Sequence, residues 1–161
     1  MNDKAHMVRH FLASLAYRFH KAVADAPEGF DNFEPDFGIR PPLAIVHHIN
    51  GVLGYGKAAL EKGDFDYWHK HPSLDWKGEI ALVHEKLQEI DTVLASDGEI
   101  EGERFERLLQ GPLSDAMTHV GQLAMLRRMA GSPIHAENFF KAAIKAGQVG
   151  EEQPAPVSPD P

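Results

Sequence analysis

The sequence predicts an all-α protein, a four-helix bundle formed by one domain. Apolar residues recur at intervals of three and four residues in four long stretches, which is the pattern of amphipathic helices. No stretch shows the sustained alternation that indicates a β-strand. Loops containing Gly and Pro separate the four stretches, so we expect each helix to bury its apolar face against the others.

The first two helices are expected at residues 4–25 and 41–60. The first contains Phe11, Leu15 and Phe19 on its apolar face, and the second contains Ile45, Ile49 and Leu53. Pro41 and Pro42 suit the start of a helix, because proline at the first helical position loses no hydrogen bond. Two loops rich in aromatic residues flank the second helix. Their aromatic side chains either pack over the ends of the bundle or wall a pocket: Phe33, Phe37, Trp68 and Trp76.

The third helix is expected at residues 77–95, and a short helix near residues 105–109 precedes the fourth. The fourth helix begins near Pro112 and ends before Gly131 and Pro133, which are stop signals. A last short helix is expected at residues 136–146. Residues 1–147 would then form the bundle domain, and the polar, Pro-rich residues 148–161 a disordered tail.

Composition excludes several classes of site and partner. The chain has 161 residues, a net charge of −8 and no cysteine. Disulfides, thiolate zinc sites and cysteine nucleophiles are therefore excluded, and the acidic balance argues against nucleic acid or an anionic membrane as partner. The N-terminus lacks the apolar core of a signal peptide, and no apolar run approaches the ~20 residues of a membrane span. We expect a cytoplasmic protein.

Histidine is frequent, with ten residues, and helical periodicity separates the two members of the "HH" pair. At ~100° per residue, His48 lies at the edge of the apolar face of the second helix, whereas His47 lies on the opposite side. His48 is therefore expected to turn inward and His47 to meet water.

In the fourth helix, Asp115, His119, Gln122 and Leu126 form one line beside the main apolar stripe. A carboxylate and an imidazole facing the interior need a partner, because an unpaired buried polar group is costly. Two ligands four residues apart on one helix, with a third from a facing helix, would make a metal site. From the spacing alone, an Asp115–His119 structural pair is the more common explanation, and an Asp115 that complements the dipole of a helix start is a further alternative.

Other polar residues are assigned less specific roles. His69 and His71 are expected in a solvated loop and His84 in packing, while Arg127 lies on an apolar side and needs an acidic or carbonyl partner. A solvated face of the third helix is expected to contain four acidic residues: Glu79, Glu85, Glu89 and Asp91.

Three stretches resemble the DinB-like family of metal-binding helical bundles, also described as the DinB/YfiT-like fold. These are "LAYRFHKAV", "RPPLAIVHHINGVLGYG" and "DAMTHVGQLAMLRRMAGSP", and the resemblance covers most of residues 5–150. In that family three histidines typically hold a divalent metal, and two of those positions match His48 and His119. The remaining position is Asp115 here, which gives a set of two histidines and one carboxylate.

The resemblance implies a divalent ion, Zn, Ni, Mn or Fe, held by His48, Asp115 and His119, with Gln122 beside it as a supporting group or substrate contact. It implies a thiol-dependent S-transferase or a hydrolase that acts on a small molecule, with a low-molecular-weight thiol as one candidate partner, and a homodimer. A metal-free bundle that binds a ligand or a partner protein, with Asp115–His119 as a structural pair, stays open.

Overall fold

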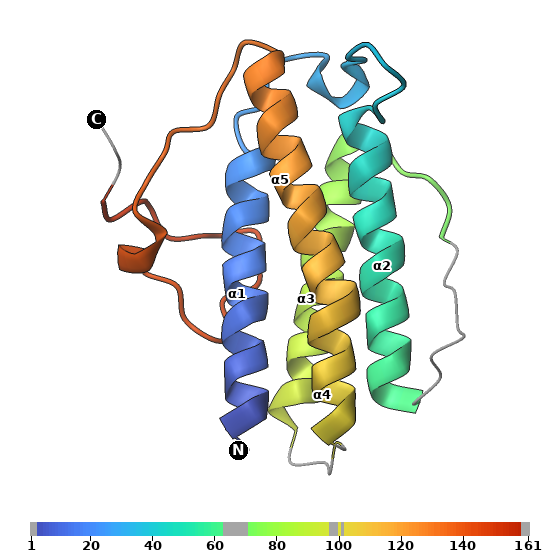
Figure 1. The fold of residues 1–161 in the computed structure, drawn as a ribbon, viewed down its shortest axis with the longest axis vertical. Coiled ribbons are helices and arrows are strands. Elements are labelled where there is room, and N and C mark those ends of the chain that lie inside the picture. The colour runs from blue at the N-terminus through green and yellow to red at the C-terminus, as the bar shows by residue number, and fades with distance from the viewer. Residues whose placement is uncertain (1–2, 63–70, 97–99, 101, 159–161) are drawn as a thin grey trace.

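The computed structural model describes residues 3–62, 71–96, 100 and 102–158 (Figure 1). Four long helices dominate: α1 (Asp3–Val23), α2 (Pro42–Lys62), α3 (Trp76–Ala95) and α5 (Ser114–Met129). A shorter helix, α4 (Gly102–Leu108), leads into α5, and single 3-10 turns lie at η1 (Phe30–Asn32) and η3 (Phe139–Lys141). The described residues contain no β-strand. The all-helical prediction is therefore confirmed.

The four long helices form a bundle in which each packs against two neighbours. α1 contacts α3 and α5, and α2 also contacts α3 and α5. α1 and α5 run in one direction and α2 and α3 in the other (Figure 1). As a result α2 and α3 are parallel.

The helix boundaries follow local signals in the sequence. Pro42 is the first residue of α2, as expected for proline at a helix start. Asp75 caps α3, because its side chain accepts a hydrogen bond from Gly78 N at 2.8 Å. At the end of α5, Gly131 adopts a left-handed φ of 75°, and Ser132 N donates to Arg127 O. This is a Schellman-type ending that glycine makes possible.

The fourth helix of the bundle is longer than the sequence predicts. α4 continues without a break through a π-helical segment, η2 (Leu109–Leu113), into α5. Pro112 lies inside this segment and has no N–H to donate. The wider π turn accommodates it, and Ser114 Oγ donates to Leu109 O at 2.6 Å. A single helical run from Gly102 to Met129 therefore forms the fourth side of the bundle.

The helix predicted at residues 136–146 is wrong, because this stretch contains only the 3-10 turn η3. Tertiary contacts replace helical hydrogen bonds here. Glu137 is drawn against α1, where it accepts hydrogen bonds from Tyr17 Oη at 2.8 Å and Lys21 Nζ at 2.6 Å. Asn138 N donates to Ser158 O instead of a helical carbonyl. These tertiary contacts outweigh the favourable helix propensity of residues 136–146.

The prediction that a tail begins at residue 148 is also wrong for the residues described, which extend to Ser158. Val149 is fully buried in the core, and its carbonyl lies 2.9 Å from Nδ1 of His84 on α3. Gln153 Nε2 donates to Gly150 O at 2.7 Å. Residues 132–158, which we call the C-terminal strap, lie along α1 on the side away from α2 (Figure 1). The strap is part of the bundle domain.

Candidate metal centre

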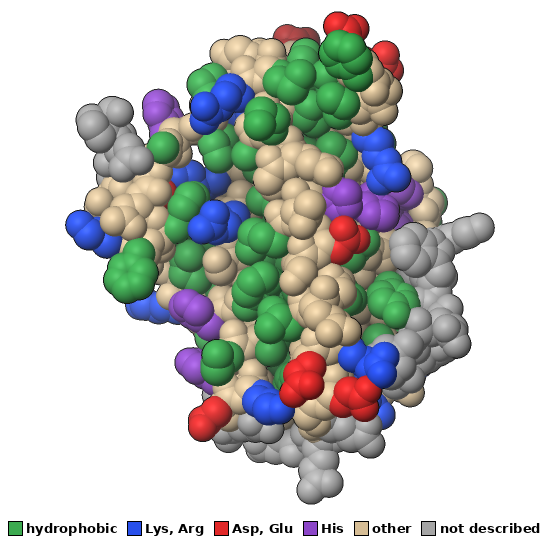
Figure 2. All heavy atoms as spheres, in the orientation of Figure 1, with side chains coloured by type: hydrophobic (Ala, Val, Ile, Leu, Met, Phe, Trp, Pro, Cys, Tyr) green, Lys and Arg blue, Asp and Glu red, His purple; other side chains and the backbone are tan. Residues whose placement is uncertain are grey.

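Three side chains from α2 and α5 converge where these two helices face each other. His48 Nε2 lies 3.8 Å from Asp115 Oδ2, and His119 Nε2 lies 3.3 Å from Asp115 Oδ1. The two imidazole rings stand nearly perpendicular, with centroids 4.7 Å apart. Each residue offers one ligand atom, and these three atoms lie within 4.8 Å of one another. Figure 2 shows histidine and acidic side chains side by side on this face of the molecule.

The continuous fourth helix changes the interpretation of Asp115. The residue before α5, Leu113, is itself helical, so Asp115 lies inside a helical run that begins at Gly102. The positive end of the helix dipole is therefore at Gly102 and not beside Asp115. The prediction that Asp115 complements the dipole at the start of a helix is therefore wrong. The position of Asp115 opposite His48 needs another explanation.

Gln122 fixes the orientation and tautomer of His119. His119 Nδ1 lies 2.8 Å from Gln122 Oε1, one turn further along α5. An amide oxygen only accepts hydrogen bonds, so Nδ1 carries the proton and Nε2 presents a lone pair toward Asp115. Two acceptors facing each other at 3.3 Å repel unless a proton or a cation lies between them. The arrangement therefore suits a bound cation.

His48 is held in its neutral form. Burial lowers the pKa of His48, and the neighbouring His119, Arg40 and His47 lower it further, while Asp115 acts in the opposite direction. A neutral imidazole has a lone pair for a metal ion at neutral pH, whereas a protonated one has none. The exposed fractions of the three side chains, 28% for His48, 48% for Asp115 and 13% for His119, leave the centre open to solvent on one side.

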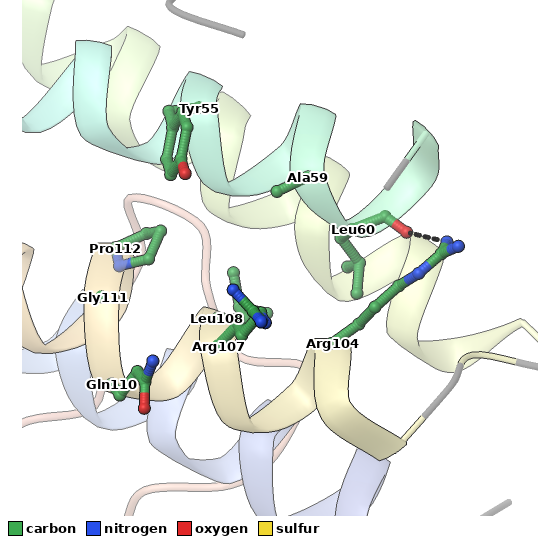
Figure 3. A pocket seen from close by; sticks show the side chains of 9 residues that line it. All are labelled: Tyr55, Ala59, Leu60, Arg104, Arg107, Leu108, Gln110, Gly111 and Pro112. Carbon is green, nitrogen blue, oxygen red and sulfur yellow. Dashed lines mark hydrogen bonds between the residues drawn. The ribbon is translucent and has the colours of Figure 1, made fainter. Parts of the chain in front are cut away.

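Two clefts lie on either side of this centre along the groove between α2 and α5. One, of about 600 Å³, is lined by His48, His119 and Gln122 at one end and by Arg40 and apolar residues elsewhere. Its apolar lining residues are Ile39, Ile45, Met125, Leu126 and Met129. The other, of about 520 Å³, reaches Asp115 and is lined by Tyr55 and the π-helical segment. A small adjoining pocket continues past Tyr55 toward Arg104 (Figure 3).

No family model matches the chain. Searches of curated proteins and of solved structures also find no match. The resemblance to DinB-like proteins, and the homodimer that it implies, therefore stay predictions. Among the described parts of the chain, no helix combines the length and apolar character needed to cross a membrane.

Two acidic residues assigned to a solvated face are buried, so that prediction is wrong for them. Glu79 is 0% exposed and Asp91 is 3% exposed. Asp91 accepts two hydrogen bonds from Arg9 of α1, at 2.8 and 2.9 Å. The signal was present, since Glu79 lies four residues before Val83 and eleven before Ile90, on the core side of α3.

The remaining candidates lie in different environments. Arg127 is buried and donates to backbone carbonyls at the end of α1, including Ala24 O at 2.7 Å, so its predicted carbonyl partner lies within the chain. Phe37 is exposed, while Trp76 packs edge-to-face on Phe30. Trp68 and His69 lie outside the described residues.

Proposed function

We propose that the chain binds one divalent metal ion through His48, Asp115 and His119 and is a metal-dependent enzyme, either a thiol-dependent S-transferase or a hydrolase. The observation that carries the proposal is the convergence of three ligand atoms within 4.8 Å, from two helices, in an open groove. Two imidazoles and one carboxylate suit Zn, Ni, Mn or Fe(II) and leave coordination positions for water or substrate. The resemblance to DinB-like proteins supports two members of this ligand set, His48 and His119.

A metal ion bound there would act as a Lewis acid and lower the pKa of a bound water or thiol. The protein contributes the orientation of the ligands. Gln122 holds the ring of His119 through Nδ1, and such outer hydrogen bonds fix both tautomer and direction. The hydrophobic surroundings keep His48 neutral, and the uninterrupted helix from Gly102 holds Asp115 one turn before His119.

The larger cleft indicates what the substrate would look like. It combines an apolar wall, which includes Met125 and Met129, with the cation Arg40 close to His48. An apolar wall with few polar groups at one end is typical of a small-molecule site. The substrate is therefore a small molecule with an apolar body and a negatively charged group, and a low-molecular-weight thiol acid belongs to this class.

The test is the metal content of purified, untagged protein, measured by elemental mass spectrometry. We expect His48→Ala and His119→Ala each to lose about one metal equivalent per chain relative to the parent, because three protein ligands are the minimum that such a site offers. The matched control is His135→Ala, an exposed histidine that is not one of the three converging ligands. Circular dichroism verifies that each variant keeps its helical fold.

The metal-free alternative makes a different prediction. An aspartate–histidine pair four residues apart, with the aspartate half exposed, contributes little to stability and gives no reason for His48 to lie opposite it. If the parent protein and both variants hold equal amounts of metal, even after incubation with Zn, Ni, Mn and Fe(II), the enzyme proposal is wrong. The bundle would then be a ligand-binding or interaction protein.

A further inference from the structure

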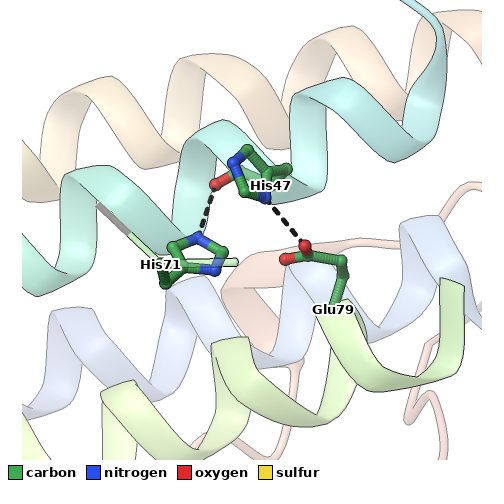
Figure 4. Close-up of side chains that lie close together, drawn as sticks. All are labelled: His47, His71 and Glu79. Atoms are coloured by element: carbon green, nitrogen blue, oxygen red, sulfur yellow. Dashed lines mark hydrogen bonds and ion pairs between the residues drawn. The ribbon is translucent and has the colours of Figure 1, made fainter. Parts of the chain in front are cut away.

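A second group of ligand-type side chains lies on the other side of α2, away from the centre described above. His47 comes from α2, Glu79 from α3, and His71 from the connection between them (Figure 4). His47 Nδ1 lies 2.8 Å from Glu79 Oε1, and the rings of His47 and His71 lie with centroids 4.2 Å apart. One ligand atom from each of the three residues lies within 4.8 Å of the other two.

Glu79 is an unusual residue at this position because its carboxylate is completely buried. Both oxygens accept hydrogen bonds: Oε1 from Leu74 N at 3.0 Å, and Oε2 from Asn50 Nδ2 at 2.6 Å. Burial raises the pKa of Glu79, but hydrogen bonds from Leu74, His47 and Asn50 outweigh it and the pKa is lowered overall. A fully buried carboxyl group needs polar partners on its oxygens, and the imidazole of His47 is one of them.

The imidazole of His47 faces this carboxyl group, with Nδ1 2.8 Å from Oε1. A divalent cation bound here would be held by the carboxylate oxygen of Glu79 and by imidazole nitrogens of His47 and His71. The hydrogen bonds to Glu79 would then have the role of outer-sphere contacts that hold a metal-binding carboxylate in place.

His71 has the same features as a metal ligand. Its Nδ1 lies 3.1 Å from Pro72 O, and its Nε2 lies 3.3 Å from His47 O. A neutral imidazole has one N–H, so it can donate to only one of these carbonyls, and the other ring nitrogen then faces a carbonyl oxygen with its lone pair. A cation bound to that nitrogen would relieve this unfavourable contact. A histidine that donates one nitrogen to a backbone carbonyl and offers the other to a metal is the common arrangement in metalloproteins.

We propose that His47, His71 and Glu79 form a second, separate cation site, which binds Zn²⁺ or a chemically similar divalent ion. Two imidazole nitrogens and one carboxylate oxygen match the ligand preference of zinc, and a water molecule would complete four-fold coordination. The ion would link α2, α3 and the chain segment that leads into α3. Its role is structural, because it would join three parts of the chain that are otherwise connected by hydrogen bonds.

The experiment is a Zn²⁺ titration of untagged, chelator-treated protein, in which binding is measured by isothermal titration calorimetry. It uses the double variant His48→Ala/His119→Ala, which lacks the first centre, so that the remaining binding reports the second group alone. We expect one equivalent of zinc to bind to this double variant and to raise its melting temperature. Adding His71→Ala should weaken that binding by about tenfold or more, since one of three protein ligands is lost, and adding His135→Ala should not.

His71 is the preferred change because it lies outside the helices and its loss leaves the buried Glu79 hydrogen bonds intact. A second variant, His47→Gln, tests the same site from α2. The second site is disproved if the folded double variant binds no zinc, or if zinc binding and the melting-temperature rise are unchanged by both His71→Ala and His47→Gln.

The two proposals can fail independently. If the parent binds a single zinc that is lost with His71→Ala but kept with His48→Ala/His119→Ala, the second site is supported and the first is wrong. If the single zinc is lost with His48→Ala/His119→Ala and kept with His71→Ala, the second site is wrong and the first is supported.

Discussion

At the scale of single residues, several polar groups inside the bundle meet a partner from a distant part of the chain. Arg9 of α1 pairs with Asp91 of α3, and Glu137 of the C-terminal strap accepts from Tyr17 of α1. Such hydrogen bonds add little net stability when formed, but a buried group left without its partner costs the full penalty of desolvation. These residues therefore specify how the elements pack more than they add to overall stability.

His84 of α3 gives the first prediction. Its ring nitrogen Nε2 is buried and has no hydrogen-bond partner among the described residues. Burial lowers the pKa of His84, while the hydrogen bond to Val149 O and the nearby Glu151 act in the opposite direction. The unfolded chain therefore binds a proton that the folded chain does not. Stability is fully present above the unfolded pKa, about 6.5, and falls as the pH drops below it, by up to about 1.4 kcal/mol for each pH unit.

The measurement is urea unfolding from about pH 7 to pH 5, with His84→Asn compared with the parent. Asparagine keeps a donor for Val149 O but cannot be protonated, so its free energy of unfolding should depend less on pH. His10→Asn, a change at an exposed histidine, is the control and should keep the parental slope. A His84→Asn slope equal to that of the parent would contradict the prediction.

At the scale of secondary-structure elements, the close approach of α2 to the π-helical segment positions Asp115. A methyl group at Gly56 would lie 2.9 Å from Cβ of Pro112 and 3.1 Å from Leu108 Cδ1. Pro112 in turn lies three residues before Asp115. Glycine at position 56 therefore allows the distance between helices at which His48 and Asp115 meet.

Two helical glycines of the bundle are expected to respond in opposite ways to alanine. Gly121→Ala should stabilise the protein by about 1 kcal/mol, because a methyl group there meets no atom within 4 Å and alanine is the better helix former. Gly56→Ala should destabilise it, because overpacking a close contact costs about 1–3 kcal/mol and exceeds the gain in propensity. Denaturant unfolding of both variants measures the difference, and equal shifts would show that α2 can move away from Pro112 without cost.

The elements also show what could be predicted from sequence and what could not. Helical periodicity is a local property, so it predicted the four long helices and placed His48, Asp115 and His119 on facing edges. It failed at residues 136–146, where helix propensity is overridden by contacts of Glu137 with α1. It also missed the burial of Glu79, because a charged residue on the core side of a helix was assigned to solvent.

At the scale of the whole molecule, the arrangement of the helices could not be predicted from the pattern alone. The long connection between α2 and α3 allows these helices to run parallel, and that brings residues near the start of each, His47 and Glu79, together. An antiparallel pair would have placed them at opposite ends. The second group of ligands is therefore a consequence of topology, whereas the first follows from facing helix edges.

The C-terminal strap gives the last prediction, because its packing distinguishes a structural segment from a tail. Val149 is 0% exposed within the core, whereas Val157, eight residues later on the same strap, is 59% exposed. Val149→Ala should lower the free energy of unfolding by about 2 kcal/mol, since it removes buried apolar surface and leaves a cavity. Val157→Ala removes the same two methyl groups from an exposed position and should change the free energy of unfolding by less than about 0.5 kcal/mol.

The comparison is made by urea unfolding, monitored by the circular dichroism of the helices. The loss in Val149→Ala should appear in the single transition of the whole bundle, because the strap covers His84 on α3 and Tyr17 on α1. Equal stability of the two variants would mean that the strap detaches in solution before the bundle unfolds.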